Sequence, residues 1–387
     1  MTLLLNTAAA AGQPGTHVLA IGVGNYPHLL DGDKKPAKDP IGLGQLDSPP
    51  VSLKAFLDWM LAPPGNGAGF SNHAAPLASV EAVCSSKALV NIDTPALGQI
   101  ALEPATRDNI QSAFEAWLDR MKSHADNVGV FYFCGHGVMV ADQHLLAEDF
   151  GRTAQPWAHA FNISLTIRAV EREVSGAVFF FVDSCRNVPR SLALTLGADP
   201  QALIGADLKK NVSCQHVTAV YATGEGQLAF APIGGQVSRF TSALLRAMSG
   251  YCGIKSPGQQ TWNVDGDSVA SAVRTLLQYD EPGKDRQVSD QSIQGPLVPL
   301  LRIGAPPKVM VRLDLAPKDR RSLYELYLAK GANRVAQTRV DQMFKVDLPR
   351  GMYEVGALDP QGALPLIRHE DEDLVPPMYM LTLKSQP

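Results

Sequence analysis

Two stretches decide the fold: VFYFCGHG at residues 130–137 and VFFFVDSCRN at residues 178–187. Each begins with a continuous run of β-branched and aromatic side chains, which is typical of a central parallel strand buried on both faces. The first run ends at His136 between two glycines, and the second ends in polar residues around Cys185. Because the carboxyl ends of parallel strands share one edge of an open sheet, we expect His136 and Cys185 to lie together.

Further apolar runs and helical patterns alternate along the chain on both sides of these two stretches. Strands are predicted at 17–23, 79–84 and 217–221. Amphipathic helices are predicted at 52–61, 106–122, 164–173, 238–248 and 268–279. Strands that alternate with helices predict an α/β domain with a mostly parallel sheet flanked by helices. We place this domain at residues 16–304.

The pattern changes after residue 304. Segments at 308–317, 343–359 and 378–385 alternate with period two and are interrupted by Pro and Gly, as in short strands. The stretch 324–331 is compatible with a strand or a helix. We therefore predict a small β-rich C-terminal domain at residues 305–387. Residues 1–15 are predicted to be a flexible N-terminal tail.

Composition excludes several classes of partner. The 387 residues carry a formal net charge of -4, which gives no general attraction to nucleic acid or to an anionic membrane surface. No run of 18 apolar residues exists, so no membrane span is predicted. The 5 cysteines are odd in number and form no CxxC pair or zinc-ligand spacing. This usage favours a reducing, cytoplasmic location and predicts no metal site.

The Cys185 and His136 pair has the residue types that nucleophilic catalysis requires. The thiolate is the reactive form of cysteine, and a neighbouring histidine can take the thiol proton. The same histidine can later protonate a leaving amine. We expect the backbone N–H groups of Gly137 and Cys185 to form an oxyanion hole. Taken singly, a cysteine or histidine after a strand is more often a structural residue, so the hypothesis depends on the pair.

These motifs resemble the caspase family. Its signature is Gln-Ala-Cys-Arg-Gly with a histidine about 50 residues upstream; here Asp183-Ser184-Cys185-Arg186-Asn187 follows His136 by 49 residues. The resemblance covers about residues 16–303 and is closer to metacaspases and bacterial caspase-like proteases than to animal caspases. It implies a caspase-hemoglobinase-like fold and a cysteine endopeptidase that acts on proteins or peptides. It also suggests a regulated effector in bacterial defence or cell death.

One departure from the signature bears on specificity. Asp183 stands where animal caspases have glutamine, and in metacaspases an acid at this position resembles the floor of the S1 pocket. The resemblance therefore implies cleavage after Arg or Lys, with Tyr221 and Glu225 as further substrate contacts. The alternative for Asp183 is a carboxylate that satisfies local backbone N–H groups.

The resemblance raises two questions about processing and metal dependence. The segment between Asn187 and His216 corresponds to the linker between caspase subunits, and Arg190, Lys209 and Lys210 are candidate self-cleavage sites. An uncut, solvated loop is the alternative. The sequence requires no cofactor. Metacaspases often need calcium, but the acidic residues after the His136 strand do not have EF-hand spacing.

Two other functions compete with a peptidase. Another Cys–His amidohydrolase is one, although residues 183–187 lack the glycines of a nucleophile elbow. A catalytically silent, caspase-like binding module is the other. For the C-terminal domain we expect a regulatory role, through a small nucleotide-like signal or a regulatory protein.

Overall fold

The computed structural model describes residues 2–7, 12–37, 42–65, 69–95, 97–187, 200–205, 212–227, 229, 235–279, 287–339 and 342–385. The chain divides into two compact units. The first unit comprises Met1–Leu245 with Asp265–Arg302, and the second comprises Arg246–Val264 with Ile303–Pro387.

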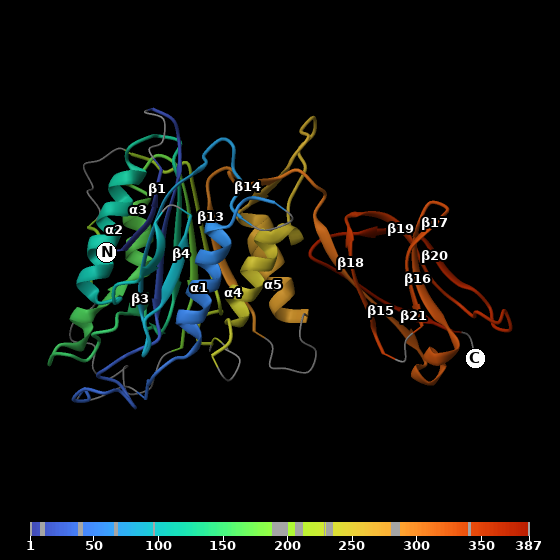
Figure 1. Ribbon diagram of the computed structural model, residues 1–387, viewed down its shortest axis with the longest axis horizontal. Helices are drawn as coiled ribbons and strands as arrows, with labels where there is room; N and C mark the ends of the chain where they lie inside the picture. The colour runs from blue at the N-terminus through green and yellow to red at the C-terminus, as the bar shows by residue number, and fades with distance from the viewer. Residues whose placement is uncertain are drawn as a thin grey trace. The chain divides into compact units, whose positions relative to one another are not determined.

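A seven-stranded sheet forms the centre of the first unit (Figure 1). The strands lie in the order β1 (Thr2–Asn6), β3 (Leu77–Ser85), β2 (Thr16–Val23), β6 (Val128–Cys134), β10 (Ala177–Asp183), β11 (His216–Tyr221) and β13 (Asp290–Gln294). The five inner strands are parallel, and the two edge strands are antiparallel to their neighbours. This arrangement confirms the predicted α/β class with a mostly parallel sheet.

Helices cover both faces of this sheet. They are α1 (Ser48–Leu61), α2 (Arg107–Met121), α3 (Ile163–Val170), α4 (Arg239–Arg246) and α5 (Gly266–Tyr279). Phe56 of α1 stacks on Tyr132 with ring centroids 4.3 Å apart, whereas Trp117 of α2 meets Phe131 edge-on at 6.4 Å. Because Phe131 and Tyr132 are consecutive residues of β6, they point to opposite faces, and so α1 and α2 lie on opposite faces.

The start of α1 differs slightly from the sequence prediction. The helix begins at Ser48, and its first turn contains Pro49 and Pro50. Proline is tolerated there because the first N–H groups of a helix have no intrahelical partner.

None of the helices in the part of the chain that the structure describes is long and apolar enough to cross a membrane.

Smaller elements follow the strands of the first unit. They are β4 (Asn91–Thr94), β5 (Gly98–Ala101), β7 (Gly137–Met139), β8 (Gln143–Leu146), η1 (Pro156–His159), β9 (Ala160–Asn162) and β14 (Pro299–Ile303). Strand β12 (Trp262–Asp265) falls almost entirely in the second unit. Strands β7, β8 and β9 form a three-stranded sheet that begins directly after His136.

The prediction of a flexible tail at residues 1–15 is wrong for its first segment. Thr2–Asn6 forms edge strand β1, antiparallel to β3, with Leu4 fully buried. The short run Leu3–Leu5 alternates in burial along the strand, so Leu4 contributes to the core while its neighbours stay partly exposed. The sequence of residues 3–5 is three consecutive leucines, which have no period-two alternation, and the strand depends on pairing with β3, which local sequence does not reveal.

The second unit contains two β-sheets around one apolar core. One sheet has the order β18 (Phe344–Pro349), β15 (Lys308–Ala316) and β21 (Met378–Lys384). The other has the order β17 (Asn333–Arg339), β16 (Glu325–Lys330), β19 (Gly351–Leu358) and β20 (Ile367–Leu374). Single-turn helices η3 (Ala247–Tyr251) and η4 (Lys318–Leu323) complete the unit. The predicted β-rich character is confirmed, and the ambiguous stretch after Tyr324 is a strand.

The division between the units differs from the predicted one in a single segment. Arg246–Val264 groups with the second unit, although it precedes α5 in the chain. Within that unit, the Tyr251 hydroxyl donates to Asp347 Oδ2 at 2.7 Å, and the Lys308 ammonium lies 5.9 Å from the Tyr251 ring centroid. These contacts join residues far apart in the sequence, so local pattern could not reveal them.

Candidate active site

Strand register delivers Cys185 and His136 to the same edge of the sheet. In the β6–β10 pair, Cys134 lies opposite Asp183, so His136 and Cys185 each follow their strand by the same two residues. The Gly135 N–H also donates to the Asp183 carbonyl at 3.2 Å, so hydrogen bonding between the two segments continues one residue past the end of β6. All seven residues of each strand are buried, which fixes this register through packing on both faces.

Two residues from the loop after β2, Tyr26 and Gly44, make three contacts with His136. Its Nε2–H donates to the Gly44 carbonyl at 2.8 Å, and its backbone N–H donates to the Tyr26 hydroxyl at 2.8 Å. The Tyr26 ring lies 4.7 Å from the imidazole, centroid to centroid. Because Nε2 carries the proton in this bond, Nδ1 is the nitrogen with a free lone pair in the neutral ring. Burial lowers the pKa of His136 to about 4, although the bond to Gly44 opposes the shift.

Cys185 is partly exposed, and its sulfur receives a hydrogen bond. The Ala229 N–H donates to Sγ at 3.2 Å. Burial raises the pKa of the Cys185 thiol, the Ala229 N–H lowers it, and the Asp183 carboxylate adds to the rise. At neutral pH the resting pair is therefore a neutral thiol and a neutral imidazole, and the imidazole can act as a general base.

Gly137 packs against the segment that carries Cys185. A Cβ at Gly137 would lie 2.5 Å from Ser184 Oγ and 2.8 Å from the Cys185 carbonyl oxygen, so no side chain fits. Two residues further along β7, the Met139 N–H donates to the Asn187 carbonyl at 3.1 Å. Alternate N–H groups of a strand point to the same side, so the Gly137 N–H is turned toward the Cys185 segment.

Sequence reasoning missed a buried amide that joins these two segments. Gln143 of β8 is fully buried, and its Nε2 donates to Ser184 Oγ at 2.8 Å. The backbone N–H of Gln143 donates to Ser164 Oγ at 3.1 Å. The β7–β8 hairpin is thus tied to the residue that precedes Cys185. A lone glutamine in an unremarkable four-residue strand carries no sequence signal for this role.

Asp183 lies beneath the sheet edge, with 5% of its surface exposed. Its Oδ2 accepts hydrogen bonds from the Ser238 hydroxyl, from Thr241 Oγ1 at 2.7 Å and from Cys134 Sγ at 3.4 Å. Burial raises the pKa of Asp183. The carboxylate therefore joins β10 to the start of α4 through side-chain donors and the Thr241 backbone N–H. This fits the structural alternative considered for Asp183, with side-chain hydroxyls as additional donors. Substrate contact by Asp183 stays a prediction.

The two other predicted substrate contacts lie against Arg186. Its guanidinium carbon lies 4.4 Å from the Tyr221 ring centroid, and NH2 lies 3.4 Å from Glu225 Oε1. The same guanidinium donates to Asp290 Oδ2 at 2.6 Å. Arg186 also exchanges backbone hydrogen bonds with the 224–227 turn, at 3.1 Å and 2.7 Å. Tyr221 and Glu225 are therefore brought to the Cys185 segment, where both contact this internal arginine.

The remaining sequence hypotheses concern self-cleavage and a metal site. Arg190, Lys209 and Lys210 lie outside the described residues. The acidic residues after the His136 strand have separate partners: Glu148 accepts from Ser85 Oγ at 2.7 Å, and Asp149 pairs with His159 at 2.8 Å. Within the described ranges, no group of three or more His, Cys, Asp or Glu side chains is arranged to hold a metal ion.

Comparisons with known proteins give a family match, a bacterial relative and a distant structural likeness. The family model described as Caspase domain matches residues 90–290, a range that contains both His136 and Cys185. The chain is 33% identical over 292 residues to uncharacterized protein y4kE of Sinorhizobium fredii, covering 71% of this chain and 83% of that protein. Caspase-1 from Spodoptera frugiperda aligns over 78% of this chain and 96% of its own, with 10% identity and a TM-score of 0.40. From the family match and the relative, the chain belongs to the caspase family of cysteine peptidases.

Proposed function

We propose that the protein is a cysteine endopeptidase with Cys185 as nucleophile and His136 as general base. The observation that carries this proposal is the bond from His136 Nε2–H to the Gly44 carbonyl. It fixes the tautomer so that Nδ1 is available to the thiol. Strand register supports the pairing, because it brings both residues to one sheet edge at equal distances along their strands.

Hydrolysis follows from these groups in two stages. Nδ1 of His136 takes the thiol proton, and the sulfur attacks the scissile carbonyl carbon. The Gly137 and Cys185 N–H groups stabilise the oxyanion, and such a donor is typically worth about 3–4 kcal/mol. His136 then protonates the leaving amine as the C–N bond breaks, which leaves a thioester on Cys185. In the second stage His136 deprotonates a water, which hydrolyses the thioester and regenerates the thiol.

We further propose cleavage after Arg or Lys. Glu225, after β11, and Asp290, the first residue of β13, support a cationic P1 side chain, because they carry two negative charges against the single positive charge of Arg186. Asp183 is buried and hydrogen-bonded at the end of β10, and its role as the floor of the S1 pocket is what the family resemblance implies. A peptide library with every residue at P1 tests this, assayed with and without added calcium. We expect hydrolysis to be concentrated at Arg and Lys. Hydrolysis of Asp-P1 peptides with no hydrolysis of Arg-P1 peptides would contradict the specificity.

A further inference from the structure

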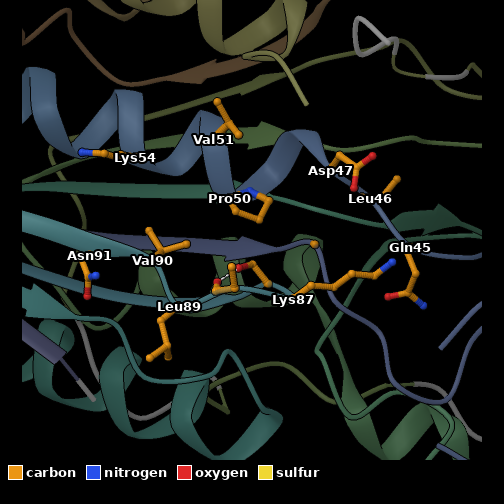
Figure 2. Close-up of a pocket in the computed structure, with 13 residues that line it drawn as sticks. Gln45, Leu46, Asp47, Pro50, Val51, Lys54, Lys87, Leu89, Val90 and Asn91 are labelled. Atoms are coloured by element: carbon orange, nitrogen blue, oxygen red, sulfur yellow. Dashed lines mark hydrogen bonds between the residues drawn. The ribbon is translucent and has the colours of Figure 1, made fainter. Parts of the chain in front are cut away.

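A pocket of about 460 Å³ lies beside the candidate active site, at the carboxyl ends of β2 and β3. Figure 2 shows Asp47, Pro50, Val51 and Lys54 at the start of α1 on one side of it, and Lys87, Leu89, Val90 and Asn91 on the other. The volume falls in the range of pockets that bind small molecules, so it has ample room for an aliphatic side chain. The proposed peptidase chemistry does not use any of these residues.

The wall of this pocket continues directly from the residue that holds His136. Gly44 accepts the His136 Nε2–H, and the next three residues, Gln45, Leu46 and Asp47, line the pocket. Gln45 is itself fixed, because its side-chain amide bonds to the backbone of Tyr26 at 2.8 Å and 2.9 Å. The pocket and the catalytic histidine therefore share one preformed support.

The order of strands places the pocket on a definite side of the nucleophile. Cys185 follows β10, His136 follows β6, and the pocket lies at the ends of β2 and β3, the next two strands of the sheet. His136 has to reach the leaving amine, so the carboxyl-terminal half of a cleaved peptide departs past the histidine. A peptide that continued in that direction would run toward the ends of β2 and β3, where the pocket lies.

We propose that this pocket binds a substrate side chain on the leaving-group side of the scissile bond, and this rests on the proposed peptidase function. The lining predicts an aliphatic side chain. Leu46, Pro50 and Val51 lie on the α1 side, and Ala88, Leu89 and Val90 lie opposite. Leu89 is 79% exposed and Val51 is 38% exposed, so a bound aliphatic group would remove apolar surface from water.

The charged groups at the pocket do not oppose this assignment. The Lys54 ammonium is paired with Asp58 at 2.9 Å on the surface of α1. Lys87 and Asp47 carry opposite charges, so the rim has no strong preference for either sign. Selection should therefore come from apolar burial, where a difference of one or two methylenes is worth about tenfold in kcat/KM.

The first test measures which residues the enzyme prefers on the leaving-group side of the cut, and it does not require the P1 preference to be known in advance. The full-length protein digests a proteome-derived peptide library, and mass spectrometry identifies which residue stands at each position on either side of every cut. We expect enrichment of Leu, Ile, Val or Met on the leaving-group side. Ala88→Trp, which fills the pocket from an exposed position, should abolish that enrichment. The matched control, Ala125→Trp, places the same exposed bulk in the turn before β6 and should retain it.

The second test separates the pocket from the catalytic proposal. Two substrates share one acyl part; one ends in an aryl amide and the other continues into the enriched residues. In the wild type we expect kcat/KM to be higher for the extended substrate than for the aryl amide. Ala88→Trp should lower the ratio of kcat/KM for the extended substrate to kcat/KM for the aryl amide about tenfold. An unchanged ratio, or a wild type with no leaving-side preference, overturns the pocket while leaving the peptidase intact. If no substrate is cleaved, the peptidase proposal fails. Fluorescence anisotropy then decides the pocket, with a labelled peptide that carries leucines after an Arg and with Cys185→Ala as the protein. The pocket is refuted if adding Ala88→Trp does not weaken binding.

Discussion

His136 and Cys185 both lie in surroundings that disfavour their charged forms. Desolvation lowers the pKa of the imidazole and raises the pKa of the thiol. The resting pair is thus neutral, and in the proposed mechanism the proton would move from sulfur to Nδ1 only when substrate arrives. This contrasts with peptidases that hold a preformed thiolate and imidazolium.

The pH dependence of kcat/KM tests this protonation state. His136 accepts a proton only when it is neutral, so activity falls as pH drops through its pKa, which is about 4. We expect the acid limb to lie well below the ordinary histidine value of about 6.5. The acid limb is measured by determining kcat/KM from pH 3.5 to 9 with a peptide substrate whose leaving group carries no charge. An acid limb at pH 6.5 or above would contradict the neutral pair.

At the same scale, the sequence pointed to the candidate pair, His136 and Cys185, but not to the residues that support His136. His136 and Cys185 each follow a continuous apolar run, and that placement gave the signal. Tyr26 and Gly44 belong to a Pro- and Gly-rich loop with no periodicity. Their contacts with His136 span 110 and 92 residues, so they arise from packing of the loop against a strand that is distant in sequence.

At the scale of elements, the β7–β8 hairpin positions the predicted oxyanion donor. Gln143 fastens the hairpin to Ser184, and Gly137 is the first residue of β7. A shift of this hairpin would move the Gly137 N–H away from the developing oxyanion without touching Cys185. Gln143 is therefore a positioning residue in this account.

Gln143→Leu should lower kcat about fivefold with little change in KM, because the loss of one buried hydrogen bond costs about 1 kcal/mol. Ser184→Ala should have a similar effect, and the double variant should lose little more. Steady-state kinetics measure all three, with exposed Gln99→Leu as the control. Additive losses in the double variant, or a change confined to thermal stability, would show that the pair does not position the hairpin.

Element prediction succeeded where periodicity was strong and stopped where partners were distant. The buried runs of β6 and β10 are continuous in sequence, and both were recognised as central strands. Strand β1 has five residues and is ordered by pairing with β3, about 75 residues later. Such pairing depends on tertiary context that local propensity does not contain.

At the scale of the molecule, the chain itself joins the second unit to helix α4, which contacts the strand that precedes Cys185. Arg246–Val264 belongs to that unit and directly continues α4, and Thr241 of α4 bonds to Asp183 at the end of β10. We propose that the β-rich unit restrains the peptidase by this route, as a regulated effector in bacterial defence or cell death would require. A small-molecule or protein signal would relieve the restraint.

Tyr251→Phe tests the restraint because it removes the bond to Asp347 within the second unit. We expect basal hydrolysis of a short peptide to rise a few-fold, since the bond holds the segment that continues α4. Tyr353→Phe is the matched control, because it removes a comparable bond to the Pro349 carbonyl at 2.9 Å outside that segment. Equal rates in wild type and both variants, all folded by circular dichroism, would refute the restraint.

The central claim is that Cys185 is the nucleophile, and peptide hydrolysis by cysteine variants tests it most directly. Cys214 offers a matched control, because it is also free, partly exposed and raised in pKa by burial. With the same peptide library, we predict that Cys185→Ala falls to the uncatalysed background, whereas Cys214→Ala hydrolyses near the wild-type rate. Hydrolysis that survives in Cys185→Ala, or that is lost equally in both variants, would contradict the account.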